Sequence, residues 1–247
     1  MRVTFDSNVW EKIFDPHDTK CAVIRNALAL GKIEGFICEA GFRIEAIQKK
    51  ERAPYFAQPR LGFRFGGIVE RDGRPYIHMS IGPEDDHHPG LPVVQAARLQ
   101  EALKSGFRLM RALAWMGLPA PPELRDPTIF VPETLASANQ RQQCQVEASA
   151  LIDARGVGKA AFDAVGGWNL PKAAPNDEKR FRKACAEWAD GELVCAHIAY
   201  QHDILCTNDR AQSAGTSIFD TANRAWLTAH YGVVFKTIDE LMTELAQ

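Results

Sequence analysis

Short apolar runs alternate with amphipathic segments at both ends of this 247-residue chain. Near the start, RVTF (2–5) and GFIC (35–38) are each followed by a segment with helical spacing, at 18–31 and 40–51. Near the end, the apolar runs are ILCT (204–207) and VVFKT (233–237), and helical patterns cover 177–189, 190–203 and 238–246. Strands that alternate with helices are typical of a parallel sheet. The sequence therefore predicts an α/β fold built on a parallel sheet.

This alternation breaks at Pro54 and returns at residue 178. The stretch between contains two short strand-like runs around an Asp72–Gly73 turn, and helical patterns at 93–117 and 133–154. We therefore expect a discontinuous α/β domain made of residues 1–53 and 178–247. Residues 54–177 are then an insertion, mostly helical, that carries a small β-hairpin.

The charge balance excludes one broad class of nucleic-acid-binding protein. Lys and Arg total 29 against 31 Asp and Glu, a formal net charge of −2, whereas a generally basic coat protein draws its affinity from many phosphate contacts. No apolar run approaches the roughly 18 residues that span a bilayer, and the first residues lack the pattern of a signal peptide. We expect a cytoplasmic protein without a membrane partner. The cysteines form no C-x-x-C pair, which favours buried, reduced thiols.

Four acids stand at comparable places in this scheme. Asp6 ends the first strand, Glu45 lies on the helix after the second, Asp190 begins a predicted helix, and Asp209 follows the strand ILCT. In a parallel sheet the carboxyl ends of the strands lie along one edge, where ligands bind in open α/β folds. We therefore expect these side chains to converge there.

Three segments resemble those of PIN-domain ribonucleases. DSNVW (6–10) is similar to the family's D-x-N opening, and ICEAGFRIEAI (37–47) places Glu45 where the family's helix carries its acid. DGELVCAHIAYQHDILCTNDR (190–210) resembles the segment in which an Asp opens an Ala-rich helix and T-x-D ends a strand. The resemblance covers residues 1–52 and 180–240. It implies a three-layer α/β/α sandwich and RNA cleavage with Mg²⁺ or Mn²⁺; many members are toxins that pair with an antitoxin protein.

The resemblance also implies which residues do the chemistry. The implied catalytic and metal-binding acids are Asp6, Glu45, Asp190 and Asp209, and the implied accessory polar residues are Asn8 and Thr207. Glu39 and Glu192 lie near Glu45 and Asp190 in the sequence and are alternatives to them. The typical toxin is shorter than this chain, so the insertion has no counterpart in that group.

Electrostatics supports a metal site independently of the resemblance. Two carboxylates about 5 Å apart repel by roughly 3 kcal/mol at an effective dielectric constant of 20, so without a cation some members of a convergent quartet should hold protons. Oxygen ligands alone favour Mg²⁺ or Mn²⁺ over Zn²⁺. Such an ion would polarise a phosphoryl oxygen and stabilise the leaving oxyanion.

Each acid also has a purely structural interpretation. Asp6 and Asp190 stand where helix N-caps are expected, and Asp209 where a turn residue is expected. The candidate RNA contacts likewise have a functional and a structural interpretation: they are either phosphate-binding residues or charges on a solvated surface. These candidates are Arg60, Arg64, Lys179 and Arg180.

The leading hypothesis is a metal-dependent endoribonuclease, either the toxin of a toxin–antitoxin pair or an RNA-processing enzyme. Its partners would be RNA, an antitoxin protein in the toxin case, and a second copy of the chain if it forms a homo-oligomer, as PIN proteins often do. One alternative is a phosphatase of the haloacid dehalogenase type, which requires a second Asp where Asn8 stands. The other is a non-catalytic module that binds RNA or protein on the same fold.

Overall fold

The computed structural model describes the backbone of residues 1–15, 17–45, 61–71, 74–83, 88, 90–113, 120–167, 178–211 and 217–246. It describes the side chains of these residues except 44, 45, 61–71, 76–83 and 178.

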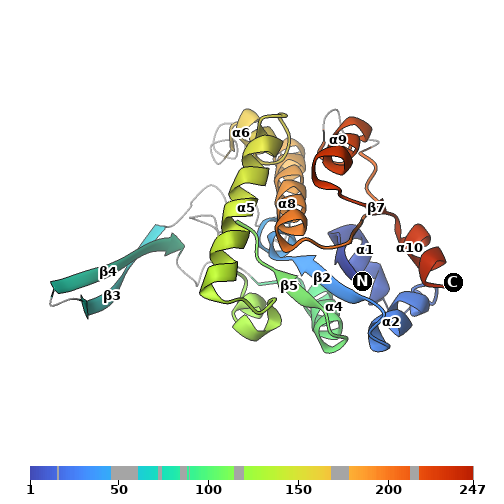
Figure 1. Cartoon of the computed structure of the whole chain (residues 1–247), viewed down its shortest axis with the longest axis horizontal. Coiled ribbons are helices and arrows are strands. Elements are labelled where there is room, and N and C mark those ends of the chain that lie inside the picture. Colours follow the sequence, from blue (N-terminus) through green and yellow to red (C-terminus); the bar gives the residue numbers. More distant parts are fainter. Residues whose placement is uncertain are drawn as a thin grey trace.

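A five-stranded parallel sheet forms the centre of the molecule (Figure 1). Its strands, in the order β5-β2-β1-β6-β7, are β5 (Arg108–Met110), β2 (Glu34–Cys38), β1 (Arg2–Phe5), β6 (Ile204–Cys206) and β7 (Phe235–Lys236). Phe5 is in register with Ile37 on one side and with Cys206 on the other. The chain order therefore changes direction between β1 and β6, and such a switch point is where open α/β sheets bind ligands.

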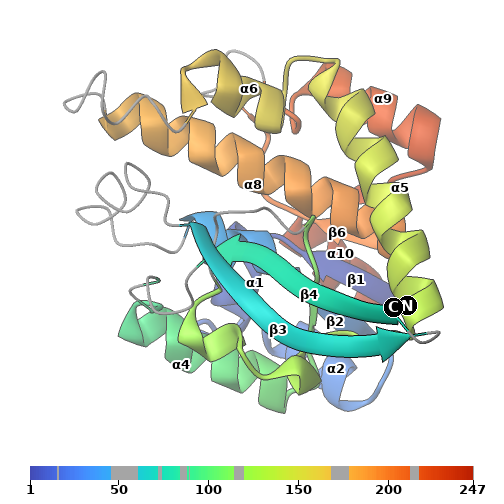
Figure 2. The same cartoon turned by 90° about the vertical axis from the view of Figure 1, so that its left-hand side faces the viewer.

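Helices cover both faces of the sheet (Figures 1 and 2). One face carries α1 (Ser7–Ile13), α2 (Ala22–Ala29), α4 (Val93–Lys104) and α10 (Ile238–Leu245). The other carries α5 (Leu135–Asp153), α6 (Lys159–Ala164), α8 (Glu178–Tyr200) and α9 (Thr221–Tyr231). Short helical turns occur at η1 (Gly41–Glu45), η3 (Pro122–Leu124) and η4 (Pro127–Ile129). The α/β prediction is confirmed, and the arrangement fits three layers.

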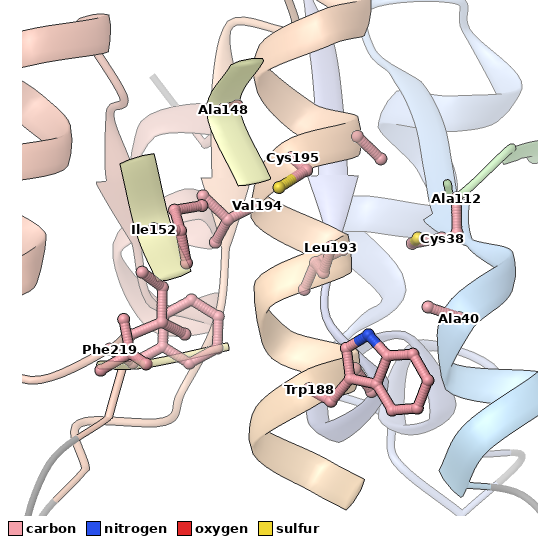
Figure 3. Close-up of a cluster of buried hydrophobic side chains, with 14 of the residues drawn as sticks. Cys38, Ala40, Ala112, Ala148, Ile152, Trp188, Leu193, Val194, Cys195 and Phe219 are labelled. Carbon is pink, nitrogen blue, oxygen red and sulfur yellow. The ribbon is translucent and has the colours of Figure 1, made fainter. Parts of the chain in front are cut away.

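Each face of the sheet has its own hydrophobic core. On the side of α1, the Phe107 ring lies 5.3 Å from Phe5 and 5.1 Å from Phe14. On the opposite side, α8 supplies the centre of the core, where Trp188 packs 4.8 Å from Phe162. Figure 3 shows residues of α8 between α5 on one side and the end of β2 on the other. The middle of α8 is thereby packed between α5 and the sheet.

The continuity of α8 corrects the expectation that Asp190 begins a helix. Asp190 lies in the middle of one 23-residue helix, although Gly191 follows it. A Cβ at Gly191 would stand 2.8 Å from the Cα of Gly158, the residue that precedes α6. Glycine is therefore required here for the close approach of two backbones, not to interrupt the helix.

The middle of the chain contributes to the sheet as well as to the helices. The pattern at 93–117 predicts one helix, but this prediction is wrong: α4 ends at Lys104, Gly106 has φ +93°, and β5 follows. Because β5 pairs with β2, the predicted boundaries at residues 54 and 178 do not coincide with the edges of the sheet. The predicted hairpin is present as β3 (Leu61–Arg71) and β4 (Arg74–Pro83), which extend away from the sheet in Figure 1; its Asp72–Gly73 turn lies outside the described residues.

The cysteines are free thiols, as the sequence predicts. Five are buried and Cys144 is partly buried. No helix in the described part of the chain has both the length and the apolar character needed to cross a bilayer.

Candidate active site

Asp6 lies at the carboxyl end of β1 and caps helix α1. Its carboxylate is 3% exposed. One oxygen, Oδ1, accepts hydrogen bonds from the backbone N–H and the hydroxyl of Ser7 at 2.5 and 3.3 Å. The other, Oδ2, accepts from Asn8 Nδ2 and Thr207 Oγ1, both at 2.6 Å. Asp6 therefore is a helix cap, as the structural interpretation expects, and its second oxygen is also oriented by groups from two different elements.

Thr207 and Asn8 connect the ends of β1 and β6. The Thr207 hydroxyl donates to Asp6 and accepts the backbone N–H of Asp209 at 3.0 Å. The Asn8 side chain donates to Asp6 and accepts the backbone N–H of Asn208 at 3.2 Å. Thr207 and Asn8, the two residues predicted to be accessory, therefore link the segments after β1 and β6 at the switch point and orient the Asp6 carboxylate.

Asp209 lies two residues beyond Thr207 in a tightly held turn. Its Oδ1 accepts the backbone N–H of Ala211 at 2.6 Å, and Ala211 has φ +53°, which is uncommon for a residue other than glycine. The guanidinium of Arg224 on α9 donates to the carbonyl oxygens of Asp209 and Phe219. Asp209 is a turn residue as well as a site candidate, and Arg224 fixes the turn from outside.

Asp190 reaches the same place from α8. It lines a small cavity of about 20 Å³ together with Asp6, and the walls also contain Cys38, Phe42 and Gln95. The structure therefore brings Asp190 and Asp6 to one cavity, from the middle of a helix and the end of a strand.

The charges of these acids influence one another. Burial raises the pKa of the Asp6 carboxyl above its ordinary value; the hydrogen bonds from Thr207 and Ser7 lower it, and the negative charge of Asp209 raises it again. Burial likewise raises the pKa of Glu187, and Asp209 adds to that effect. Ionising all of these groups together is therefore unfavourable without a compensating positive charge.

Glu187 and Arg224 were not among the residues predicted from the sequence. Glu187 stands one turn before Asp190 on α8, and its Oε1 accepts the backbone N–H groups of Gly158 and Ile218 at 3.2 and 2.7 Å. Its helical spacing from Asp190 is a signal that sequence reading could have used. The role of Arg224 depends on backbone carbonyls and leaves no such signal.

Several predicted residues lie away from this cluster or outside the described side chains. Glu45 ends the turn η1, and its side chain, like that of Arg64 in β3, is outside the described part; Arg60 is outside it entirely. Lys179 and Arg180 are exposed in the first turn of α8.

The two alternative acids have structural partners. Glu39 accepts hydrogen bonds from Arg43 at 2.9 Å and from the backbone N–H of Ala112 at 3.0 Å. Glu192 accepts from the backbone N–H of Leu113 at 2.9 Å. Both carboxylates therefore satisfy backbone groups of the segment after β5.

The described side chains contain no group of three or more His, Cys, Asp and Glu residues close enough together to hold a metal ion. The described side chains do not include that of Glu45, the fourth predicted acid. The site has to be interpreted from its own chemistry, because the chain matches no protein-family model, no curated protein and no solved structure.

Proposed function

We propose that this chain is a metal-dependent endoribonuclease with a PIN-like α/β/α domain. One observation carries the proposal: the buried carboxylate of Asp6, at the switch point of the sheet, shares a cavity with Asp190 and a repulsive interaction with Asp209. Asp6 thus has one acid neighbour in its cavity, Asp190 on α8, and a second in the turn after β6, Asp209, whose charge acts on it. This carboxyl edge is where α/β sheets bind ligands. A site that assembles like charges at an energetic cost is a candidate for function.

The donor groups fit a hard divalent cation. Carboxylate oxygens of Asp6, Asp190, Asp209 and Glu45 would hold Mg²⁺ or Mn²⁺, which prefer oxygen ligands. Hydrogen bonds from Thr207 and Asn8 to Asp6 are the kind of support that metal-binding carboxylates receive from their neighbours. The bound ion would supply positive charge to the phosphoryl oxygens of the RNA.

The chain's own residues orient the acids. Thr207 and Asn8 fix Oδ2 of Asp6, and the backbone of Ala211 fixes Oδ1 of Asp209. Arg224 holds the backbone on which Asp209 sits. These contacts make the site rigid before substrate arrives, as hydrolytic sites require.

An RNA-cleavage assay tests the proposal. The purified full chain is incubated with a mixed RNA pool, with Mn²⁺ or Mg²⁺ and with a chelator, beside the double variant Asp6→Asn/Asp209→Asn. A matched control, Asp163→Asn/Asp239→Asn, removes two exposed carboxylates from α6 and α10. We expect metal-dependent cleavage by the parent and the control and none by the folded double variant.

Other outcomes separate the alternatives. Metal-independent binding of RNA without cleavage would favour the non-catalytic binding module, and hydrolysis of a small phosphomonoester would favour the phosphatase. Equal cleavage by the parent and the Asp6/Asp209 variant would refute the site. A toxin role, which would require an antitoxin partner, stays a prediction within the ribonuclease proposal.

A further inference from the structure

A wide groove lies beside the acid cavity, between helices on opposite faces of the sheet. Its volume is about 920 Å³. Helices α1 and α4 form its walls on one face of the sheet, and the first half of α8 forms the wall on the other. The lining residues are Ser7, Asn8, Glu11, Lys12, Gln95, Arg98, Lys179, Arg182, Lys183 and Ala186.

The groove is strongly basic, although the chain as a whole is not. Five of its lining side chains are Lys or Arg, and one is acidic. That acid, Glu11, is paired with Arg98 at 3.2 Å and accepts a hydrogen bond from Gln95 at 2.9 Å. Arg98 also pairs with Asp15 at 2.9 Å. An internal pair therefore neutralises Glu11, whereas Lys12, Lys179 and Arg182 line the groove outside these pairs.

Three cations carry the charge of the groove toward solvent. Lys12 on α1 and Lys179 on α8 are exposed, and Arg182 on α8 is half-buried. Among the described residues, none of these three side chains has a hydrogen bond or an ion pair. A groove with unpaired cations on both walls attracts a polyanion.

The groove is continuous with the acid cavity. Ser7 and Gln95 line both spaces, and Asn8 lines the groove while donating to Asp6. On α8, residues 179, 182, 183 and 186 lie on one face, and the same face continues to Asp190. At 1.5 Å per residue, Lys179 lies roughly 16 Å from Asp190 along the helix axis.

We propose that this groove binds the phosphate backbone of the RNA on one side of the bond to be cleaved, with phosphates at Lys12, Lys179 and Arg182. The proposal rests on the proposed ribonuclease function and deepens it. Helix α4, from the middle of the chain, supplies Gln95 and Arg98 to one wall. The middle segment thereby acts in substrate positioning, and the acid cavity at the end of the groove receives the reacting phosphate.

RNA fits this surface better than an acidic protein segment does. The cations of the groove lead directly to the acids of the cavity. This order suits RNA, because the cations would hold its phosphates and the acid site would cleave one of its phosphodiester bonds. An acidic peptide would gain the cations, but it has no phosphodiester bond for the metal-bound acids at the end of the groove to act on, so the groove and the cavity together favour RNA.

Binding measured without metal tests the groove separately from catalysis. A fluorescein-labelled single-stranded RNA is titrated with the full chain in chelator, by fluorescence anisotropy, at several salt concentrations. The test variant is Lys12→Gln/Lys179→Gln/Arg182→Gln. The matched control is Lys20→Gln/Lys32→Gln/Lys104→Gln, which removes three lysines that do not line the groove. Each phosphate contact contributes about 0.7 to the slope of log Kd against log salt for a single strand.

We expect the test variant to lose about 2 from that slope and the control to keep it. Between about 50 and 200 mM salt, the Kd of the parent should then rise roughly 20-fold more than that of the test variant. Three results would each overturn the proposal. They are an unchanged slope in the test variant, no RNA binding by the parent, and competition by polyglutamate that equals that of RNA at equal charge. Cleavage with an unchanged slope would refute the groove alone. Groove-dependent binding with no cleavage under any metal would refute the ribonuclease alone.

Discussion

The hydroxyl of Thr207 should contribute measurably to stability where Asp6 is ionised, because it donates to that buried carboxylate. The substitution Thr207→Val removes the hydroxyl and nearly preserves the side chain's shape. It deletes the 2.6 Å bond to Asp6 and the 3.0 Å bond from the backbone N–H of Asp209. A hydrogen bond to a charged group contributes about 1.5–3 kcal/mol and a neutral one about 0.5–1.5 kcal/mol. The added methyl group offsets about 0.8 kcal/mol, so we expect a net loss of about 2 kcal/mol.

The loss should depend on pH, because the hydroxyl stabilises only the ionised form of Asp6. Burial raises the pKa of Asp6 in the folded protein, and the Thr207 hydrogen bond lowers it. The contribution of the Asp6 bond is therefore present above that folded-state pKa and is lost as the pH falls through it, whereas that of the bond from the Asp209 backbone N–H stays. Removing the hydroxyl raises the Asp6 pKa further.

Urea denaturation of the parent, Thr207→Val and Thr207→Ser at neutral and acidic pH measures both effects. The Ser variant keeps the hydroxyl and loses one methyl, so we expect a loss of about 1 kcal/mol that does not change with pH. If Val proves as stable as the parent at neutral pH, or if its loss is the same at every pH, the hydroxyl does not support an ionised Asp6 and the reasoning is wrong.

Two other substitutions test the packing and titration of the cores. Gly191→Ala should destabilise the protein by about 1–3 kcal/mol, despite alanine's higher helix propensity, because its Cβ would lie 2.8 Å from the Cα of Gly158; a thermal melt that is unchanged or raised would contradict the close contact. Burial lowers the pKa of His197 to about 4 and that of His202 to about 3. Both are neutral in the folded protein. Their contribution to the free energy of unfolding is therefore complete above the unfolded pKa of about 6.5 and is lost as the pH falls below it. From pH 7 to 5 the two should contribute a loss of about 4 kcal/mol, and His202→Gln should remove about half of it in denaturation measured at both pH values. Equal pH dependence in the parent and this variant would refute the assignment of a buried neutral His202.

The placement of Asp6, Thr207 and Asp209 at the carboxyl edge of the sheet could be predicted, because each residue follows a recognisable strand. Short apolar runs in β1 and β6 end abruptly in polar residues, and parallel strands place such ends along one edge. The strand order, and hence the switch point between β1 and β6, came only from the structure.

The features that the sequence did not predict depend on contacts between distant segments. Gly191 is indistinguishable in sequence from a helix break, and only its contact with Gly158 explains it. The residues after Lys104 continue a helical pattern, yet Gly106 ends the helix and the apolar residues that follow form β5 beside β2. A short buried strand and a buried helical turn have the same composition, so periodicity alone could not separate them.

The position of the basic groove also could not be predicted. Lys12, Arg98 and Lys179 lie far apart in the sequence, and residues 54–177, taken as a whole, show no excess of basic residues. The groove exists because α4 packs beside α1 and because α8 runs past the carboxyl edge of the sheet. Charge patterning along the chain indicates the cations at the start of α8, among them the predicted candidate Lys179, but it does not show that Lys12 and Arg98 lie opposite them.

The central claim is that Asp6, Asp190 and Asp209 act as one metal site, and Mn²⁺ binding tests it most directly. Electron paramagnetic resonance measures the free Mn²⁺ during titration of the full chain and of Asp6→Asn, Asp190→Asn and Asp209→Asn, with Asp163→Asn as the control for an exposed carboxylate. We predict that each of the three substitutions weakens Mn²⁺ binding about 10-fold or more and that the control leaves it unchanged. Binding by all three variants that equals the parent's, or a parent that binds no Mn²⁺, would contradict the account.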